Sequence, residues 1–245
     1  MFYKDISYNG ETYRGVYFNQ YRPTSVSAAA STSTSTSFQD DNNYFINTIY
    51  WFKYEPIKWQ ILTEEDGKAL IVSDLVLDAK EFYHESQTNQ FYHKNEFGYE
   101  TGKGYANSYE LSDIRRWLNA QFGETAIPLS QRGVWSISEV DNSLESTGVT
   151  SNTYANDCGT TQDIFFLLSY KELKDYFPVE DDRKASASDY AYCQGISSGS
   201  CYWLRSPSNY GGNMTFAQYL NYSSYNSQTV TVTTNGVRPA CWINL

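Results

Sequence analysis

Only two histidines and two methionines occur in the 245 residues, and the four cysteines lack Cys-x-x-Cys spacing. A zinc ribbon is therefore excluded, because it needs paired cysteines at that spacing. The two histidines are His84 and His93, and the nearby carboxylates are Glu85 and Glu96. Metal sites need several well-placed ligands, so we expect surface or hydrogen-bonded histidines, no metal site and no cofactor.

The sequence also lacks a long apolar run and an excess of basic residues. No segment approaches the roughly 18 apolar residues of a membrane span, and the N-terminal MFYKDISYNG lacks a signal-type apolar core. Lys and Arg total 18 against 28 Asp and Glu, which gives a formal charge of −10. Nucleic acids and anionic membranes attract basic proteins, so we expect neither partner and no membrane insertion.

The cysteines indicate a reduced chain, with one alternative left open. Cys158 and Cys241 are far from any other cysteine in the sequence, whereas Cys193 and Cys201 would close a small loop in an oxidising environment. We expect thiols at all four positions.

Aromatic residues, at 17%, are abundant. The length suits one domain spanning residues 1–245. Ser25 to Ser37, SVSAAASTSTSTS, is too small and polar to bury a face, so we expect a solvated and dispensable loop within that domain.

Turn residues and alternating apolar residues predict two hairpins. Asn9-Gly10 is typical of a tight hairpin turn between aromatic strands. Ile57 to Ile61 alternates with period two, Asp66-Gly67 supplies a turn, and Ala69 to Val72 returns. We expect N- and C-terminal strands, within Ile49–Leu62 and Val237–Leu245, to meet in one sheet.

Two helices are predicted among the strands. Residues 108–122 carry apolar residues at helical spacing, and Gly123 fits a left-handed C-terminal cap. Residues 169–177 open with the capping box of Ser169 and Glu172, and Pro178 ends the helix. Capped helices among short strands predict an α+β fold.

The C-terminal stretch Cys201 to Leu245 holds the most informative pattern. Ser208 to Gln228 contains four Asn, four Tyr and four Ser in 21 residues, a composition typical of antibody-like binding loops. Alternation along strands would turn Phe216 and Leu220 inward. We expect a ligand-binding surface formed by residues of this tract: Asn209, Tyr210, Asn213, Tyr219, Asn221, Tyr222, Ser224, Tyr225 and Asn226.

Apolar, β-prone segments flank this tract and predict a rigid frame under it. The expected frame residues are Trp203, Arg205, Arg238 and Trp242. We expect the two arginines to be partly buried, with bidentate hydrogen bonds to carbonyls or to a carboxylate such as Asp163. A ligand-anion clamp would need both arginines exposed in one pocket.

Arg115 and Arg116, in the first predicted helix, suggest two alternatives. They would form a phosphate site, or one would face water while the other pairs with an acid such as Asp113. We favour the second.

From about Ile49 to Leu245 the chain resembles a bacterial and phage domain family of unknown function, the DUF6273 group. The segments YWLRSP and GVRPACW carry most of this resemblance. It implies a variant of the C-type lectin fold, which formylglycine-generating enzymes share. Some proteins with this fold are diversified by retroelements, whose error-prone reverse transcriptase rewrites adenines so that Asn codons become others. The tract resembles such a variable region, and Tyr222-Ser223 stands where other members have Asp-Gly.

The resemblance implies a display protein that binds a protein or cell-surface target. Without a signal sequence or membrane segment its location stays open, and attachment to a phage particle or another protein is one alternative. An invariant C-type lectin-like binding domain is the second reading. The chain lacks the Glu-Pro-Asn type of motif that calcium-dependent sugar lectins use. Formylglycine-type chemistry needs a pair of reactive cysteines, and Cys193 and Cys201 are the only close pair in the sequence. We therefore expect no enzyme, and the sequence leaves the oligomeric state open.

Overall fold

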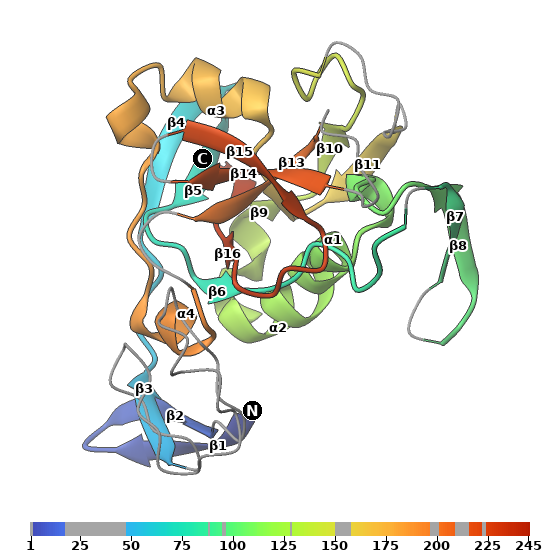
Figure 1. Ribbon diagram of the computed structural model, residues 1–245. Helices are drawn as coiled ribbons and strands as arrows, with labels where there is room; N and C mark the ends of the chain where they lie inside the picture. The colour runs from blue at the N-terminus through green and yellow to red at the C-terminus, as the bar shows by residue number, and fades with distance from the viewer. Residues whose placement is uncertain are drawn as a thin grey trace.

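The computed structural model describes residues 2–17, 48–87, 89–94, 97–127, 129–149, 158–196, 201–208, 216–221 and 224–245. The predicted loop Ser25–Ser37 lies outside the described residues. The fold is α+β, with short, mostly antiparallel sheets, few helices and long connections, as the sequence predicts. Figure 1 shows the N-terminal strands at one end of the molecule and the other elements gathered above them.

The N-terminal sheet has the order β1-β2-β3, formed by Phe2–Tyr8, Glu11–Tyr17 and Ile49–Lys53. The Asn9-Gly10 turn is confirmed, with φ of 51° and 82° at these two residues. Its small apolar cluster contains Val16 with Tyr50, Phe52 and Tyr190, and the Phe52 ring meets Tyr190 of α4 (Asp189–Cys193) edge-on at 5.7 Å.

A five-stranded sheet joins the chain's C-terminus to its middle. Its path is β12-β17-β5-β4, with β9 also paired to β17. The strands are β12 (Phe165–Leu167), β17 (Pro239–Asn244), β5 (Lys68–Ser73), β4 (Trp59–Glu65) and β9 (Trp135–Ser136). The Asp66-Gly67 hairpin is confirmed, with φ of 48° and 74°. The expectation for Ile49–Leu62 holds only for β4, because Ile49–Lys53 pairs with β2 instead.

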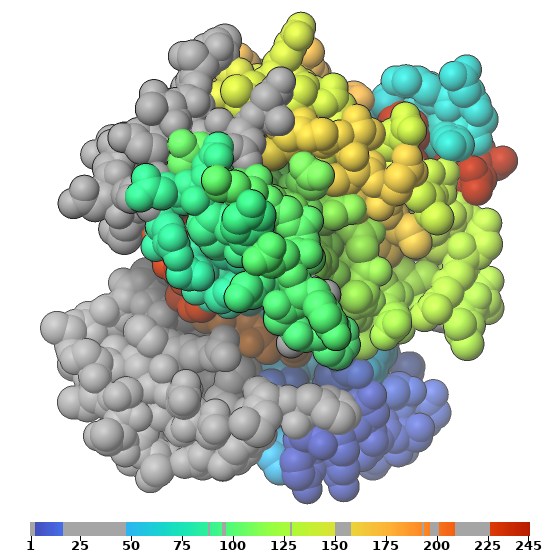
Figure 2. Space-filling model, turned by 90° about the vertical axis from the view of Figure 1, so that its right-hand side faces the viewer, coloured from blue at the N-terminus to red at the C-terminus, as the bar shows by residue number. Residues whose placement is uncertain are grey.

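A second five-stranded sheet has the order β15-β14-β13-β16-β6. Its strands are β15 (Ser224–Thr229), β14 (Phe216–Asn221), β13 (Tyr202–Pro207), β16 (Gly236–Val237) and β6 (Asp78–Ala79). Within this sheet, only the β13–β16 pair is parallel. Two further hairpins are β7–β8 (Phe91–Lys94, Glu100–Gly104) and β10–β11 (Ser138–Asp141, Thr160–Asp163). The blue N-terminal strands lie at the bottom of Figure 2, and the green β7–β8 hairpin lies toward the viewer.

The predicted helix over 108–122 is wrong in its bounds and continuity. A 3-10 turn (Tyr109–Leu111) precedes α1 (Asp113–Trp117), a π-helical turn (Leu118–Phe122) and α2 (Gly123–Ala126). Gly123 has φ of −58° and does not end the helix in a left-handed cap. The helical path continues through α2, and Ile127, which follows it, is buried in the core. The break falls at Ser112, which is extended and caps α1 by accepting from the Arg115 amide.

The second helix, α3 (Tyr170–Tyr176), is confirmed. Ser169 accepts from the Glu172 amide while the Glu172 carboxylate accepts from the Ser169 amide, so the capping box is complete. Further 3-10 turns span Leu129–Val134 and Glu180–Arg183. Among the helices that the structure describes, none is long and apolar enough to cross a membrane.

Gly236 marks a close contact of three segments. Its amide donates to the Cys201 carbonyl at 2.8 Å. A Cβ at this position would lie 2.3 Å from Val76 Cγ1 and 2.6 Å from the Cys201 oxygen. Only glycine fits there, because the nearest obstacles include backbone.

Gly236→Ala is expected to destabilise the protein by about 1–3 kcal/mol or more, because overpacking here forces the backbone of β13 or β16 to shift. Urea denaturation of purified variants measures this loss. Gly133→Ala is the control, since its Cβ would meet no atom within 4 Å. Equal stability of the two variants would contradict the close packing.

Candidate functional site

Strand β13 is the buried support next to the predicted recognition tract. All six of its residues are buried, from Tyr202 to Pro207. Trp203 is fully buried, its indole N–H donates to the Lys80 carbonyl at 2.7 Å, and its ring contacts Phe82 at 5.7 Å. Trp242 of β17 is only partly buried, so the two tryptophans contribute unequally to the frame.

Arg205 forms a bidentate ion pair with Glu172, not with Asp163 as proposed from the sequence. Arg205 Nη2 donates to Glu172 Oε1 at 2.7 Å, and Nη1 donates to Glu172 Oε2 and to the Leu167 carbonyl at 3.0 Å. The Arg205 side chain is 3% exposed and that of Glu172 is 27% exposed. Because the same carboxylate completes the capping box, one residue fixes both the start of α3 and the end of β13.

The electrostatics of this pair favour ionised Glu172. Burial alone would raise the pKa of Glu172. The positive charge of Arg205 and the hydrogen bonds from Arg205 and Ser169 outweigh it and leave the pKa of Glu172 below its usual value. Ser206 extends the contact, because its hydroxyl donates to the Thr147 carbonyl at 2.7 Å and accepts from the Tyr170 amide at 2.9 Å.

Arg238 is 2% exposed, and its hydrogen bonds go to carbonyls and neutral side chains. Its Nε donates to the Ser73 carbonyl at 2.9 Å, and Nη1 donates to the Arg183 carbonyl and the Tyr202 hydroxyl. Its guanidinium lies 5.4 Å from the ring centroids of both Phe177 and Tyr202. Arg238 thus bonds to carbonyls, which is one of the two partner types expected from the sequence. An anion clamp would need both arginines exposed in one pocket, and both are buried.

Asp163 pairs with Arg115. Arg115 Nε lies 2.8 Å from Asp163 Oδ1, and Asp163 is fully buried. Arg116 pairs with Asp113 as expected, but the expectation that the other arginine faces only water is wrong. Asn119 links this helical segment to β12. Its side-chain NH2 donates to the Phe165 carbonyl, and its side-chain oxygen accepts from the Phe165 backbone amide.

The described part of the recognition tract is the hairpin β14–β15, attached to the edge of β13. Its register opposes Tyr219 to Asn226, Asn221 to Ser224 and Leu220 to Tyr225. Four of the nine predicted surface residues lie outside the described residues, namely Asn209, Tyr210, Asn213 and Tyr222.

The register divides the hairpin into two faces, because directly opposed residues lie on the same face. Tyr219, Asn221, Ser224 and Asn226 share one face, whereas Tyr225 shares the other with Leu220. Toward the sheet interior, Tyr219 opposes buried Trp203; on the edge strand, Asn226 is exposed. Of the five predicted surface residues that the structure describes, four therefore share one face of the hairpin and Tyr225 lies on the other.

The histidines and cysteines have separate environments. The His84 Nδ1 lies 2.6 Å from Asp113 Oδ2. His93 is fully buried, and its ring stacks on Phe91 with the two ring centroids 4.4 Å apart. Burial lowers the pKa of His93. Over the described ranges, no three His, Cys, Asp or Glu residues gather as a metal would need. Cys201 and Cys241 are buried, and burial raises the pKa of the Cys241 thiol well above its usual value.

Sequence reasoning missed a cavity of about 670 Å³ between the β7–β8 hairpin and the helical segment after Ser112. It brings His84 and Asp163 together with Arg115 and Arg116, of which only the two arginines are neighbours in the sequence. Only the Arg115-Arg116 pair gave a signal, as the phosphate-site alternative. The pairing of Arg115 with Asp163 across 48 residues gave none.

One of three comparisons with known proteins found a match. A family model described as a domain of unknown function, DUF6273, matches residues 66–245. No curated protein matches, and no solved structure matches. The matched stretch begins inside the β4–β5 turn, so it contains β5 and the whole candidate surface, while the sheet β1-β2-β3 precedes it.

Glu172→Gln is expected to cost about 3–5 kcal/mol of unfolding free energy, because it leaves the Arg205 charge buried without its counterion. Glu180→Gln is the matched control: Glu180 is 68% exposed and 4.0 Å from Arg183, so its loss should cost about 0–1 kcal/mol. Urea denaturation at pH 7 compares the two, and equal costs would contradict a structural role for the pair.

The same pair predicts a pH dependence. The folded-state pKa of Glu172 lies below its usual value of 4.5, so its contribution is complete above about pH 4.5 and is lost as the pH falls through the folded pKa. Stability measured from pH 7 to pH 3 should fall less steeply in Glu172→Gln than in the parent. Parallel profiles would mean that Glu172 is not the titrating group.

Proposed function

The chain belongs to the DUF6273 family, and on that premise we propose that it is a recognition protein rather than an enzyme. The binding surface is the tract Ser208–Gln228, and the partner is a protein or cell-surface target. The observation that carries the proposal is the attachment of β14–β15, which contains most of the tract, to the fully buried strand β13. A surface rich in Tyr, Asn and Ser then rests on a support that does not depend on it.

Both flanks of the tract support this division of labour. Arg205 fixes the preceding strand through Glu172, and Arg238 fixes the following strand through the Ser73 and Arg183 carbonyls. None of these contacts uses a residue between Ser208 and Gln228. Substitutions within the tract would therefore leave the frame contacts in place, as a display scaffold requires.

The edge position of β15 also supports a binding role. On the described path of its sheet, β15 pairs only with β14, and Asn226 on this strand is exposed. Ser227 holds the strand near the frame through a hydrogen bond with Ser208. We propose that the face shared by Tyr219, Asn221, Ser224 and Asn226 is the main contact surface, with tyrosines as the large, stiff contact groups.

The finer proposal is a C-type lectin-like fold whose tract is diversified by a retroelement. It rests on the Asn- and Tyr-rich composition between two well-anchored strands. An invariant binding domain of a phage or bacterial surface protein is the alternative. Sequencing the DNA beside the gene separates them: a near-identical template repeat next to a reverse transcriptase gene supports diversification, and its absence removes it.

Replacing Tyr219, Tyr222 and Tyr225 together with Ser should abolish target binding and leave the melting temperature nearly unchanged. The chain, immobilised through its N-terminus, is first screened against an array of purified cell-surface proteins. Each protein it retains is then tested by biolayer interferometry with the triple variant. A folded triple variant that still binds would contradict the assignment of the surface, and an unfolded one would place these tyrosines in the core.

Trp203→Ala is the control for the frame. It should cost about 3–5 kcal/mol, as truncation of a fully buried aromatic does, whereas Trp242→Ala should cost less because Trp242 is only partly buried. Chemical denaturation measures both losses. A smaller cost for Trp203→Ala than for the tyrosine triple variant would reverse the roles of frame and surface.

A further inference from the structure

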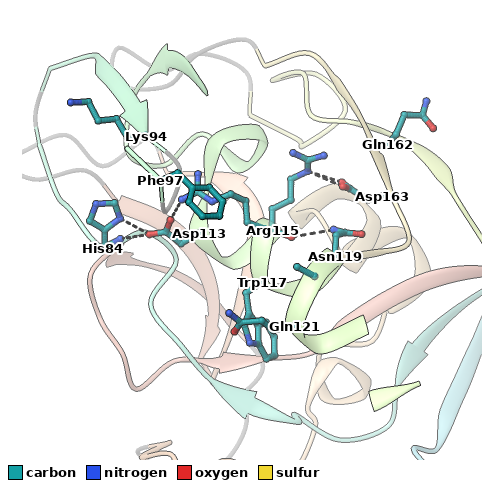
Figure 3. Close-up of a pocket in the computed structure, with 12 residues that line it drawn as sticks. His84, Lys94, Phe97, Asp113, Arg115, Trp117, Asn119, Gln121, Gln162 and Asp163 are labelled. Atoms are coloured by element: carbon teal, nitrogen blue, oxygen red, sulfur yellow. Dashed lines mark hydrogen bonds and ion pairs between the residues drawn. The ribbon is translucent and has the colours of Figure 1, made fainter. Parts of the chain in front are cut away.

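His93 is the one fully buried side chain on strands β7 and β8, both of which the structure describes in full. Tyr92 and Lys94, on either side of it, are exposed. On β8 the residues are exposed or partly buried except Gly104, which has no side chain. Figure 3 shows the Lys94 side chain directed away from Arg115. His93 is therefore the side chain that anchors this hairpin on the rest of the chain.

Aromatic and aliphatic groups enclose the His93 imidazole. Its centroid lies 4.4 Å from that of Phe91 and 4.6 Å from that of Tyr83, which is 1% exposed. Gly102 stands opposite His93 in the register. A Cβ at Gly102 would lie 2.9 Å from Leu111 Cδ2, so the hairpin packs closely against the 3-10 turn that contains Leu111.

The two ring nitrogens of His93 are buried, and neither has a hydrogen-bond partner among the described residues. A neutral imidazole has one N–H donor and one acceptor, whereas an imidazolium has two donors and a positive charge. Protonation therefore adds a second unpartnered donor and a charge in a place that solvates neither.

The surroundings of the ring favour its neutral form. Burial is the largest cause that lowers the pKa of His93 below its usual value of 6.5. Three backbone carbonyls act in the opposite direction without outweighing burial, namely those of Gly104, Tyr105 and Leu111.

The charged and titratable neighbours do not offset this preference. The positive charge of Arg116 in α1 lowers the pKa of His93 further. Tyr83 stays neutral, because burial raises its pKa to about 12. The Asp113 carboxylate, whose charge acts on Tyr83, is bonded to Arg116 and to the His84 ring.

We propose that His93 is an acid-sensitive latch, and that protonation of its imidazole releases the β7–β8 hairpin from Tyr83 and Leu111. Release lets water solvate the imidazolium. It also opens the cavity of about 670 Å³ beside the hairpin, because Lys94 and Phe97 form part of the lining. No residue of the tract Ser208–Gln228 takes part, so this device and the proposed recognition surface are tested separately.

The pH window follows from the lowered pKa. Above pH 6.5 His93 is neutral in the docked and in the released hairpin, so docking has its full strength. Below pH 6.5 the released hairpin binds a proton that the docked one does not. Docking then weakens by up to about tenfold per pH unit until the pKa of the docked form is reached, and at pH 5 by about tenfold in total.

Hydrogen exchange measured by mass spectrometry on the full chain tests this release. Exchange times at pH 7 and pH 5 are scaled for the intrinsic rate. Peptides that cover β7 and β8 should lose protection about tenfold at pH 5, whereas peptides that cover the buried strand β13 should keep theirs.

The two histidines supply a matched pair of variants. His93→Phe keeps an aromatic ring but removes the titrating nitrogens, so protection of the hairpin should be equal at pH 7 and pH 5. His84→Gln removes the only other histidine, whose side chain is 53% exposed, and should leave the pH dependence of the parent unchanged.

NMR titration of the imidazole C2–H signals needs no substitution at His93. His84→Gln assigns the two signals, and the His93 signal should titrate with a pKa below 6.5. A His93 pKa of 6.5 or higher would overturn the proposal even if His93→Phe failed to fold. So would equal hairpin protection at the two pH values in the parent, an unchanged pH dependence in folded His93→Phe, or its disappearance in His84→Gln.

Discussion

The bidentate pair between Arg205 and Glu172 is the interaction on which the C-terminal half of the fold depends. Glu172 closes the capping box of α3 and neutralises a buried guanidinium at the end of β13. Ser206 adds contacts to Thr147 and Tyr170 next to it. Removal of the Glu172 charge leaves the guanidinium of Arg205, whose side chain is 3% exposed, without its counterion, which costs far more than loss of a surface pair.

The two buried arginines differ in the groups that accept hydrogen bonds from their guanidinium. Arg205 has a carboxylate partner, whereas Arg238 spreads its donors over two carbonyls, a tyrosine hydroxyl and the Gln60 amide oxygen. Gln60 in turn donates to Asp74 at 2.7 Å, which places a negative charge one residue further away. Both arrangements tie strands distant in sequence to one position, and the tract between them contributes to neither.

Local chemistry explains which features the sequence predicts correctly. The turns at Asn9-Gly10 and Asp66-Gly67 and the capping box at Ser169 depend on residues at most three positions apart. The capping box even identified Glu172, but not its second role. That role depends on a residue 33 positions away, as Arg115 depends on Asp163 across 48 positions.

The helix over 108–122 failed for a related reason. Its apolar spacing is real, since Ile114, Leu118 and Phe122 are all buried, but spacing alone does not reveal a break at Ser112 or a π-helical turn. At the candidate site, the frame residues were predicted from apolar, arginine-containing flanks. The division of the tract into two faces required the strand register, which only the structure supplies.

The central claim is that the frame folds independently of the side chains displayed on the tract. A library tests this directly, with the nine positions Asn209, Tyr210, Asn213, Tyr219, Asn221, Tyr222, Ser224, Tyr225 and Asn226 randomised together and protease resistance measured for each displayed member. A second library randomises Trp203, Arg205, Glu172 and Arg238. The account predicts parental resistance for most members of the first library and for few of the second; equal losses in both would contradict it.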